Sequence, residues 1–277
     1  MDQYAVIGNP IAHSKSPQIH AAFAAQTGQP MAYGALLAPL DGFRAAVAEF
    51  RRNGGRGLNV TVPFKLEAHA LADALSARAE AAGAVNTLRF DAEGIFGDNT
   101  DGAGLVRDLV HNLGQPVGGA RVLLLGAGGA ARGAILPLLD EHPASLTIAN
   151  RTPARAEELA ARFAPRAVVT ELDAGGFAAL AGRQFDVVIN ATASSLSDQA
   201  PPLPPGIYAP QSLAYDMMYG RGDTPFMEAA RHDGAARLAD GLGMLVEQAA
   251  ESFLLWRGLR PATAPVLEAL RAGIGKG

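Results

Sequence analysis

The stretch from Arg121 to Gly133, RVLLLGAGGAARG, constrains the fold of this chain more than any other. The apolar run Val122 to Leu125 has the length of a buried strand, and the glycines after it lead into Ala-rich sequence that favours a helix. A strand, a tight glycine turn and a helix form the unit that binds a dinucleotide pyrophosphate. Gly126 permits the turn, Gly128 lets the backbone approach the phosphates, and Ala131 lets the helix pack on the strand. The alternative is an ordinary glycine-rich connection.

A Pro- and Gly-rich break at residues 115–119 precedes this stretch and is a candidate domain boundary. After the break, strands and helices alternate along the chain. Strands are expected at 121–125, 145–150, 167–170, 185–190, 213–216 and 236–240, and helices at 129–140, 152–163, about 173–181, from 224–225, 244–256 and from 264. This alternation is typical of a doubly wound parallel sheet. The predicted fold class is therefore α/β, with a Rossmann-type sheet in the second part of the chain.

The part before the break also mixes strands and helices. Strands are expected at 3–8, 32–37 and 57–62, a hairpin at 84–90 and 94–97, and helices at 16–25, 40–52, 66–82 and 104–113. Ser16 followed by Pro17 predicts a helix start with Ser16 as N-cap, and Gly28 ends that helix.

Composition narrows the class of protein. The chain has 277 residues, 49% of them hydrophobic, and a net charge of −4, which argues against an electrostatic nucleic-acid binder. It has no cysteine, so thiolate catalysis and Cys-ligated metal are excluded, and no metal site is predicted. No signal peptide is visible, because the N-terminal sequence MDQYAVIGNP lacks a basic region and a long apolar run. No membrane span is visible, because the longest apolar stretch contains Arg132 and a glycine cluster. We expect a cytoplasmic protein.

Lysine is rare in this chain: of 23 basic residues only Lys15, Lys65 and Lys276 are lysines. Lysine can exchange its proton at neutral pH and arginine in practice cannot, so a lysine inside a motif is a candidate acid–base group. Lys65 follows the expected strand 57–62 and Pro63, at the end of a strand where open α/β sheets place their sites. The alternative is a solvated cation at a helix start, although a positive charge there opposes the helix dipole.

Three further features have both a functional and a structural interpretation. Ser14 and Ser16 crowd a helix N-terminus, which is a natural seat for a carboxylate, or they are loop and cap. Asp101 in the turn GDNTDG is either catalytic or a capping residue of the next helix. Gln248, on an early turn of a helix, is unremarkable by itself.

The end of the second strand of the Rossmann-type sheet predicts the cofactor. NAD-binding sheets carry an acidic residue there, whereas this strand ends in Asn150, Arg151 and Thr152. No carboxylate repels a 2′-phosphate, and Arg151 can pair with one, with Arg155 as a second partner. The sequence therefore predicts NADP. The alternative is that Thr152 caps the next helix and Arg151 is a surface residue.

Taken together, the motifs resemble one family. YAVIGNPIAHSKSP, NVTVPFK, AGAVNT, GDNTDG, LLGAGGAARG, NRT, YDMMYG, TPF and ADGLGMLVEQAA occur in this order over nearly the whole chain, as in the shikimate dehydrogenase family. The resemblance implies reversible, NADP-dependent reduction of 3-dehydroshikimate to shikimate, a step toward chorismate and the aromatic amino acids. It also implies a substrate domain at 1–101, an NADP domain at 102–241, C-terminal helices 242–277 that pack back on the substrate domain, and an active site in the cleft between the domains.

The resemblance also implies roles for single residues. The catalytic pair would be Lys65 and Asp101. The substrate would be bound by Ser14, Ser16, Thr61, Asn86, Asp101, Tyr219 and Gln248, and the cofactor by Gly126, Ala127, Gly128, Gly129, Ala130, Asn150, Arg151, Thr152, Arg155, Met217 and Gly241. The chain departs from many members at Arg221, where they have proline, which leaves the path of the turn from Gly220 to Asp223 open.

Two other functions compete with this one. A quinate/shikimate dehydrogenase would use NAD and a broader set of substrates, and the residues Asn150 to Thr152 argue against it. A non-catalytic NADPH sensor would need the glycine turn and Arg151 but not Lys65, Asp101 and Gln248. A small-molecule substrate is the expected partner, with neither nucleic acid nor membrane. The oligomeric state, with a homodimer as one option, and the cis or trans state of Pro63 are open.

Overall fold

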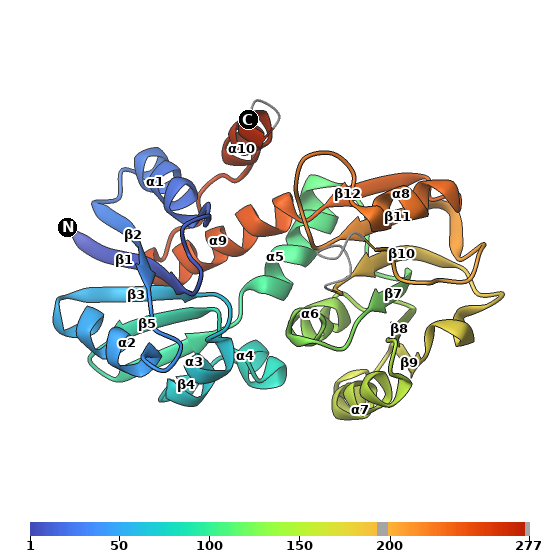
Figure 1. Cartoon of the computed structure of the whole chain (residues 1–277), viewed down its shortest axis with the longest axis horizontal. Coiled ribbons are helices and arrows are strands. Elements are labelled where there is room, and N and C mark those ends of the chain that lie inside the picture. Colours follow the sequence, from blue (N-terminus) through green and yellow to red (C-terminus); the bar gives the residue numbers. More distant parts are fainter. Residues whose placement is uncertain (193–198, 275–277) are drawn as a thin grey trace. The chain divides into compact units, whose positions relative to one another are not determined.

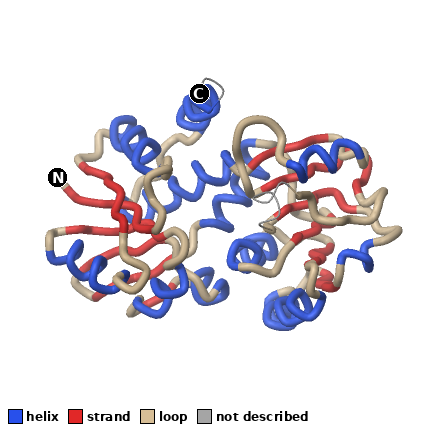
Figure 2. The backbone as a smooth tube through the Cα atoms, viewed as in Figure 1, coloured by secondary structure: helices blue, strands red, loops and turns tan. Residues whose placement is uncertain are grey.

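Two six-stranded sheets organise the computed structural model, which describes residues 1–192 and 199–274 (Figures 1 and 2). Each sheet belongs to its own compact unit. The first unit contains Met1–Gly104 and Val246–Ala269, and the second contains Leu105–Leu245 and the chain from Leu270 onward. The domain division expected from the sequence stays a prediction; the contacts within the structure group the last turns of the chain with the second unit.

The first sheet has the order β2-β1-β3-β5-β6-β4. β1, β2 and β3 run parallel. β5 lies antiparallel to β3 and forms the expected hairpin with β6. The strands are β1 (Asp2–Gly8), β2 (Met31–Leu37), β3 (Gly55–Val60), β4 (Ala74–Leu75), β5 (Thr87–Asp91) and β6 (Gly94–Asp98). Because β5 is antiparallel, its start lies beside the end of β3 and the end of β6, and polar segments converge at that edge.

Helices α1 (Ser16–Thr27) and α2 (Phe43–Arg52) pack on these strands, and α1 ends at Gly28 as expected. The single helix expected at 66–82 is wrong. It is divided into α3 (Lys65–Leu71) and α4 (Ala77–Ala82) by β4, which pairs with β6. Ser76 starts the second helix, because its side chain accepts a hydrogen bond from Ala79 N. The Ala-rich composition of this stretch conceals that break.

The second sheet has the order β12-β11-β10-β7-β8-β9, and all its strands are parallel. This is the strand order of the Rossmann fold. The strands after β7 are added first on one side of it, as β8 and β9, and then on the other side, from β10 onward. The strands are β7 (Arg121–Leu125), β8 (Ser145–Ala149), β9 (Glu171–Gly175), β10 (Phe185–Asn190), β11 (Tyr208–Asp216) and β12 (Arg237–Asp240). The predicted doubly wound parallel sheet is confirmed.

The helices that accompany this sheet are α6 (Gly129–Asp140), α7 (Pro153–Phe163) and α8 (Pro225–His232). The remaining helices are α5 (Asp101–Arg107), which continues as a π-helical turn over Asp108–Asn112, α9 (Leu242–Arg257) and α10 (Ala264–Ile274). Among the described residues, no helix has the length and apolarity needed to cross a bilayer.

Two expected elements of the second unit are wrong. Instead of a strand at 167–170, β9 comes at Glu171–Gly175, and instead of a helix at 173–181 there is a short 3-10 turn, Phe177–Leu180. Val168 and Val169 are β-branched and favour a strand, but they are 86% and 69% exposed. The register with β8, rather than local propensity, selects the strand.

Each unit has its own aliphatic and aromatic core. In the first, Ile7, Leu58, Phe43 and Phe64 belong to one buried cluster. In the second, strand residues such as Leu123 and Val188 pack with Phe226 of α8. These cores hold the strand ends, and therefore the loops that follow them, in place.

Burial changes the acid–base behaviour of one histidine in the first unit. His20 on α1 is fully buried and stacks on Tyr33, with ring centroids 4.2 Å apart and an angle of 7° between the planes. Phe23, Phe253 and Trp256 surround it. Burial lowers the pKa of His20 to about 3, although the nearby Asn59 opposes the shift. The folded protein therefore holds His20 neutral.

We predict that His20 makes the protein sensitive to acid. The folded-state pKa is about 3 and the ordinary value is 6.5, so the unfolded chain binds more protons between these limits and stability falls as the pH drops below 6.5. His20→Leu removes this loss. When the pH falls from about 7 to about 5, the unfolding free energy of the wild type should decrease by about 2 kcal/mol more than that of the variant. Denaturant unfolding at both pH values measures the gain, and parallel pH dependences would contradict it.

Candidate active site

The polar edge of the first sheet collects four predicted site residues. Thr61 follows β3, Asn86 precedes β5, and Asp101 comes soon after β6. The register aligns these strand ends, with Asn59 opposite Thr87 and Thr87 opposite Asp98. Lys65, the first residue of α3, reaches the same place.

Lys65 and Asp101 form an ion pair, with 2.6 Å between Lys65 Nζ and Asp101 Oδ2. Their side chains are 32% and 17% exposed, so the amine is accessible to a small molecule while the carboxylate is more sheltered. The other carboxylate oxygen, Oδ1, accepts a hydrogen bond from Asn86 Nδ2 at 2.8 Å. Because both oxygens are engaged, Asp101 is fixed and holds the amine in one position.

Gln248 joins this group from α9. Its Oε1 accepts hydrogen bonds from Thr100 Oγ1 at 3.3 Å and from Asn86 Nδ2 at 3.4 Å. Gly104 permits the approach of the helix, because a Cβ at that residue would lie 2.6 Å from Gln248 N. Gln248, unremarkable in the sequence alone, therefore lies beside the Lys65–Asp101 pair.

The serines at the start of α1 differ from the expected capping arrangement. Ser16 is the first helical residue and Lys15 occupies the N-cap position, so the expectation that Ser16 is the cap is wrong. Ser14 Oγ instead accepts the Ser16 N–H at 3.3 Å. Pro17 keeps its place in the first turn, and the hydroxyl of the buried Ser16 is left for other partners.

A layer of buried polar residues lies below this group, and the sequence analysis gave it no role. It consists of Asn59, Thr87, Thr100 and Ser252, which hydrogen-bond to one another. Asn59 and Thr87 are polar residues in buried strands, whereas Thr100 and Ser252 lie outside the strands and carry no such signal. Such residues are also found as strand polars satisfied by neighbours, and the pattern does not say which neighbours.

In the second unit, the predicted cofactor residues lie at the carboxyl edge of the sheet. Gly126 follows β7 with φ +110°, and a Cβ there would lie 3.2 Å from the Ala191 carbonyl oxygen after β10. α6 starts at Gly129 with Gly128 as an N-cap that offers no side chain. Gly128, Gly129 and Ala130 are exposed, so the free N–H groups of this helix start can hold a pyrophosphate.

The segment after β8 also fits the predicted cofactor. Thr152 is the N-cap of α7, but its side chain makes no capping hydrogen bond, and Asn150 Nδ2 donates to its carbonyl oxygen at 3.0 Å. Arg151 and Arg155 are exposed, and no acidic residue occupies this strand end. A 2′-phosphate would meet only neutral and basic side chains here.

Met217 and Gly241, predicted to border the nicotinamide, are brought together by the ends of β11 and β12. A Cβ on Gly241 would lie 2.1 Å from the Met217 carbonyl oxygen, so only glycine allows this approach. Tyr219 follows on the same loop and is half-buried. Burial raises the pKa of Tyr219, and the Asp240 carboxylate adds to the rise. The phenol is therefore neutral at physiological pH and can donate a hydrogen bond.

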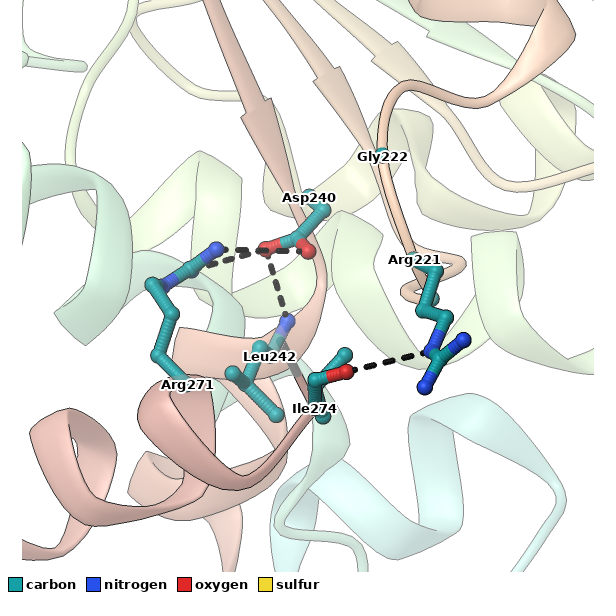
Figure 3. A pocket seen from close by; sticks show the side chains of 7 residues that line it. Arg221, Gly222, Asp240, Leu242, Arg271 and Ile274 are labelled. Carbon is teal, nitrogen blue, oxygen red and sulfur yellow. Dashed lines mark hydrogen bonds and ion pairs between the residues drawn. The ribbon is translucent and has the colours of Figure 1, made fainter. Parts of the chain in front are cut away.

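The turn from Gly220 to Asp223, whose path was open, lines a pocket of about 400 Å³ (Figure 3). Arg221 Nε donates to the Ile274 carbonyl oxygen at 3.2 Å, and Arg271 pairs with Asp240 at 2.9 Å. The end of α10 thus holds Arg221 and the turn on which it lies. Among the described residues, no group of three or more His, Asp or Glu side chains could hold a metal ion.

Comparisons with known proteins agree with this arrangement. Residues 6–88 match the shikimate dehydrogenase substrate binding domain, residues 108–197 match shikimate / quinate 5-dehydrogenase, and residues 241–271 match the shikimate 5′-dehydrogenase C-terminal domain. The chain is 69% identical to the shikimate dehydrogenase (NADP(+)) of Aromatoleum aromaticum over 100% of this chain and 99% of that protein.

Solved structures are similar over the full length. An Ael1 enzyme from Pseudomonas putida is 51% identical with a TM-score of 0.91, covering 98% of each chain. Shikimate 5-dehydrogenase from Thermus thermophilus, solved in complex with NADP(H) and shikimate, is 35% identical with a TM-score of 0.85, covering 98% of this chain and 99% of that one.

The glycine turn gives a prediction on stability. Gly126→Ala places a side chain at φ +110° against a backbone carbonyl and should lower the unfolding free energy by more than about 1 kcal/mol. Gly128→Ala is the matched control, because a Cβ added at Gly128 would have no neighbouring atom within 4 Å. Denaturant unfolding of both variants measures the difference. Equal stabilities would show that the turn does not need glycine at 126.

Proposed function

The chain belongs to the shikimate dehydrogenase family, and we propose that it catalyses the reversible, NADP-dependent reduction of 3-dehydroshikimate to shikimate with Lys65 as proton donor. The observation that carries the proposal is the 2.6 Å contact of Lys65 with Asp101 in a chain whose relatives with this activity match it over its full length. Reduction of a ketone requires a proton for its oxygen, and an amine that a fixed carboxylate holds in place can donate that proton.

When bound, NADPH supplies the hydride that reduces the ketone carbon. The oxygen of that ketone then becomes an alkoxide and needs a proton, which Lys65 donates from Nζ. Asp101 holds the amine in position and keeps it charged until the transfer, and Asn86 holds the carboxylate through Oδ1. In the reverse direction Lys65 accepts the proton from the hydroxyl of shikimate.

The remaining predicted residues orient the two reactants. Ser14 and Ser16 at the start of α1 bind the substrate carboxylate, and the ring hydroxyls are contacted by Thr61, Asn86, Asp101, Tyr219 and Gln248. Several polar contacts fix a near-reactive geometry and reject analogues that lack one hydroxyl. Gly126 to Ala130 hold the pyrophosphate, Asn150 to Arg155 hold the 2′-phosphate, and Met217 and Gly241 border the nicotinamide.

The competing functions are separated by specific features. A sensor without catalysis would have no need for an amine, a carboxylate and an amide joined by hydrogen bonds beside Gln248. A quinate/shikimate dehydrogenase that uses NAD would bind the ribose with an acidic residue, and the segment after β8 has none. One oxidation assay that compares shikimate with quinate, and NADP with NAD, distinguishes the three. The homodimer, the absence of nucleic-acid and membrane partners, and the cytoplasmic location stay predictions.

Replacing the proposed proton donor tests the mechanism. Lys65→Ala should lower kcat by roughly 10²–10⁴-fold with little change in the KM for shikimate, because general acid–base catalysis is lost. Lys65→Arg is the matched variant: it keeps the charge but cannot release a proton at neutral pH, so its kcat should be comparably low. Steady-state kinetics measure both. A kcat near the wild-type value in either variant would exclude Lys65 as the donor.

Replacing the proposed phosphate ligand tests the cofactor assignment. Arg151→Ala should weaken NADPH binding by about 1.5–3 kcal/mol, the range of a hydrogen bond to a charged group, and leave NADH binding unchanged. Titration calorimetry with both cofactors measures the difference, and Arg166→Ala on the exposed turn after α7 is the control. An equal loss for NADPH and NADH would contradict the assignment.

A further inference from the structure

Tyr33 on β2 has no role in the mechanism above, yet its hydroxyl makes a short contact toward the site. It donates to Asn59 Oδ1 at 2.7 Å, across the intervening strand β1. Burial raises the pKa of Tyr33 well above its ordinary value, while the nearby Ser16 opposes the rise. Tyr33 is therefore a neutral phenol between α1 and β3.

The Tyr33 ring is held firmly by its neighbours. His20 stacks on it with centroids 4.2 Å apart and nearly parallel planes, and the Trp256 ring lies 6.2 Å away. His20 is fully buried, and Trp256 is held by the hydrogen bond that it donates to the Leu88 carbonyl oxygen. These two rings therefore restrict the motion of the Tyr33 ring. The position of the Tyr33 hydroxyl is thus set by packing.

Asn59 connects the Tyr33 hydroxyl to α9 through hydrogen bonds. Its Nδ2 donates to Ser252 Oγ at 2.8 Å and to Thr87 Oγ1 at 3.1 Å. Ser252 Oγ in turn donates to the carbonyl oxygen of Gln248, one helical turn earlier, at 3.1 Å. The orientation of Asn59 therefore bears on where Gln248 lies.

The same layer reaches the catalytic pair. Thr87 Oγ1 donates to Asn86 Oδ1 at 3.0 Å, and the Thr100 N–H donates to that oxygen at 2.8 Å. Asn86 Nδ2 then contacts Asp101. Hydrogen bonds run without interruption from Tyr33 through Asn59, Thr87 and Asn86 to Asp101.

We propose that Tyr33 is a positioning residue for substrate binding, which holds the polar layer beneath Asp101 and Gln248 in place through Asn59. The proposal rests on the proposed function, because it takes shikimate as the ligand. Without the phenol, the Asn59 amide loses the hydrogen bond that sets its orientation, and the hydrogen bonds that it donates to Thr87 and Ser252 are no longer held in place.

The test compares Tyr33→Phe with Tyr4→Phe. Tyr4 lies opposite Tyr33 in the sheet and stacks on Trp256 at 4.7 Å, but its hydroxyl contacts Arg257 rather than the polar layer. Tyr33→Phe should raise the KM for shikimate about 3- to 10-fold, the effect of one lost hydrogen bond, while kcat and the KM for NADP stay within about twofold of wild type. Tyr4→Phe should leave all three unchanged.

A double variant shows whether the effect passes through Asn59. In an Asn59→Ala background, Tyr33→Phe should change the KM for shikimate by less than about twofold, because residues that act together are not additive. Thermal unfolding of each variant confirms that it folds. An unchanged or lower KM for Tyr33→Phe, an equal rise for Tyr4→Phe, or full additivity with Asn59→Ala would overturn the proposal.

Calorimetric titration with shikimate, without NADP, repeats the comparison independently of turnover. A wild-type protein that binds shikimate but does not oxidise it would contradict the proposed function, and the titration would still decide the role of Tyr33. A wild-type protein that neither binds nor oxidises shikimate would overturn both.

Discussion

The Asp101 carboxylate is the group on which the first unit converges. One oxygen pairs with Lys65 and the other accepts from Asn86, so a single anion at the start of α5 joins the helix after β3 and the residue before β5. A carboxylate that is held at both oxygens has one orientation, and it therefore fixes the position of the Lys65 amine. The antiparallel hairpin is what makes this convergence available, because it returns the start of β5 to the end of β3. An all-parallel sheet would carry that start to the opposite edge.

In the second unit, close contacts between backbone segments position the loops that are predicted to bind the cofactor. The Gly126 turn lies against the carbonyl after β10, and Gly241 lies against the carbonyl of Met217. Each contact places a loop at the carboxyl edge of a parallel sheet, where its N–H groups and small residues stay accessible. The rigid part is the buried sheet, and the predicted binding residues lie on the loops that it carries.

The sequence predicted those features that local chemistry determines. The glycine turn, β7, α6 and β10 lie where expected, because apolar strands, glycines and Ala-rich helices are local signals. Lys65 was singled out by the scarcity of lysine and by its place after a strand. Asp101 and Gln248 were ambiguous as single residues, and only the ordered motifs of a family assigned them roles, which their hydrogen bonds to Asn86 now support.

What the sequence did not predict depends on tertiary contacts. The break of 66–82 into two helices follows from the pairing of β4 with β6, and β9 at 171–175 follows from its register with β8. Ser16 carries a cap-and-proline signature, yet Ser14 accepts its N–H. Tyr33 is predicted only as a strand residue, because its hydrogen-bond partner Asn59 is 26 positions away in the sequence.

The central claim is that the residues around Lys65 and Asp101 oxidise shikimate with NADP. The most direct measurement is the absorbance of NADPH after the purified protein is mixed with shikimate and NADP. We expect NADPH to form continuously, in proportion to the protein added. Absence of NADPH formation from a folded protein that binds NADP would contradict the account.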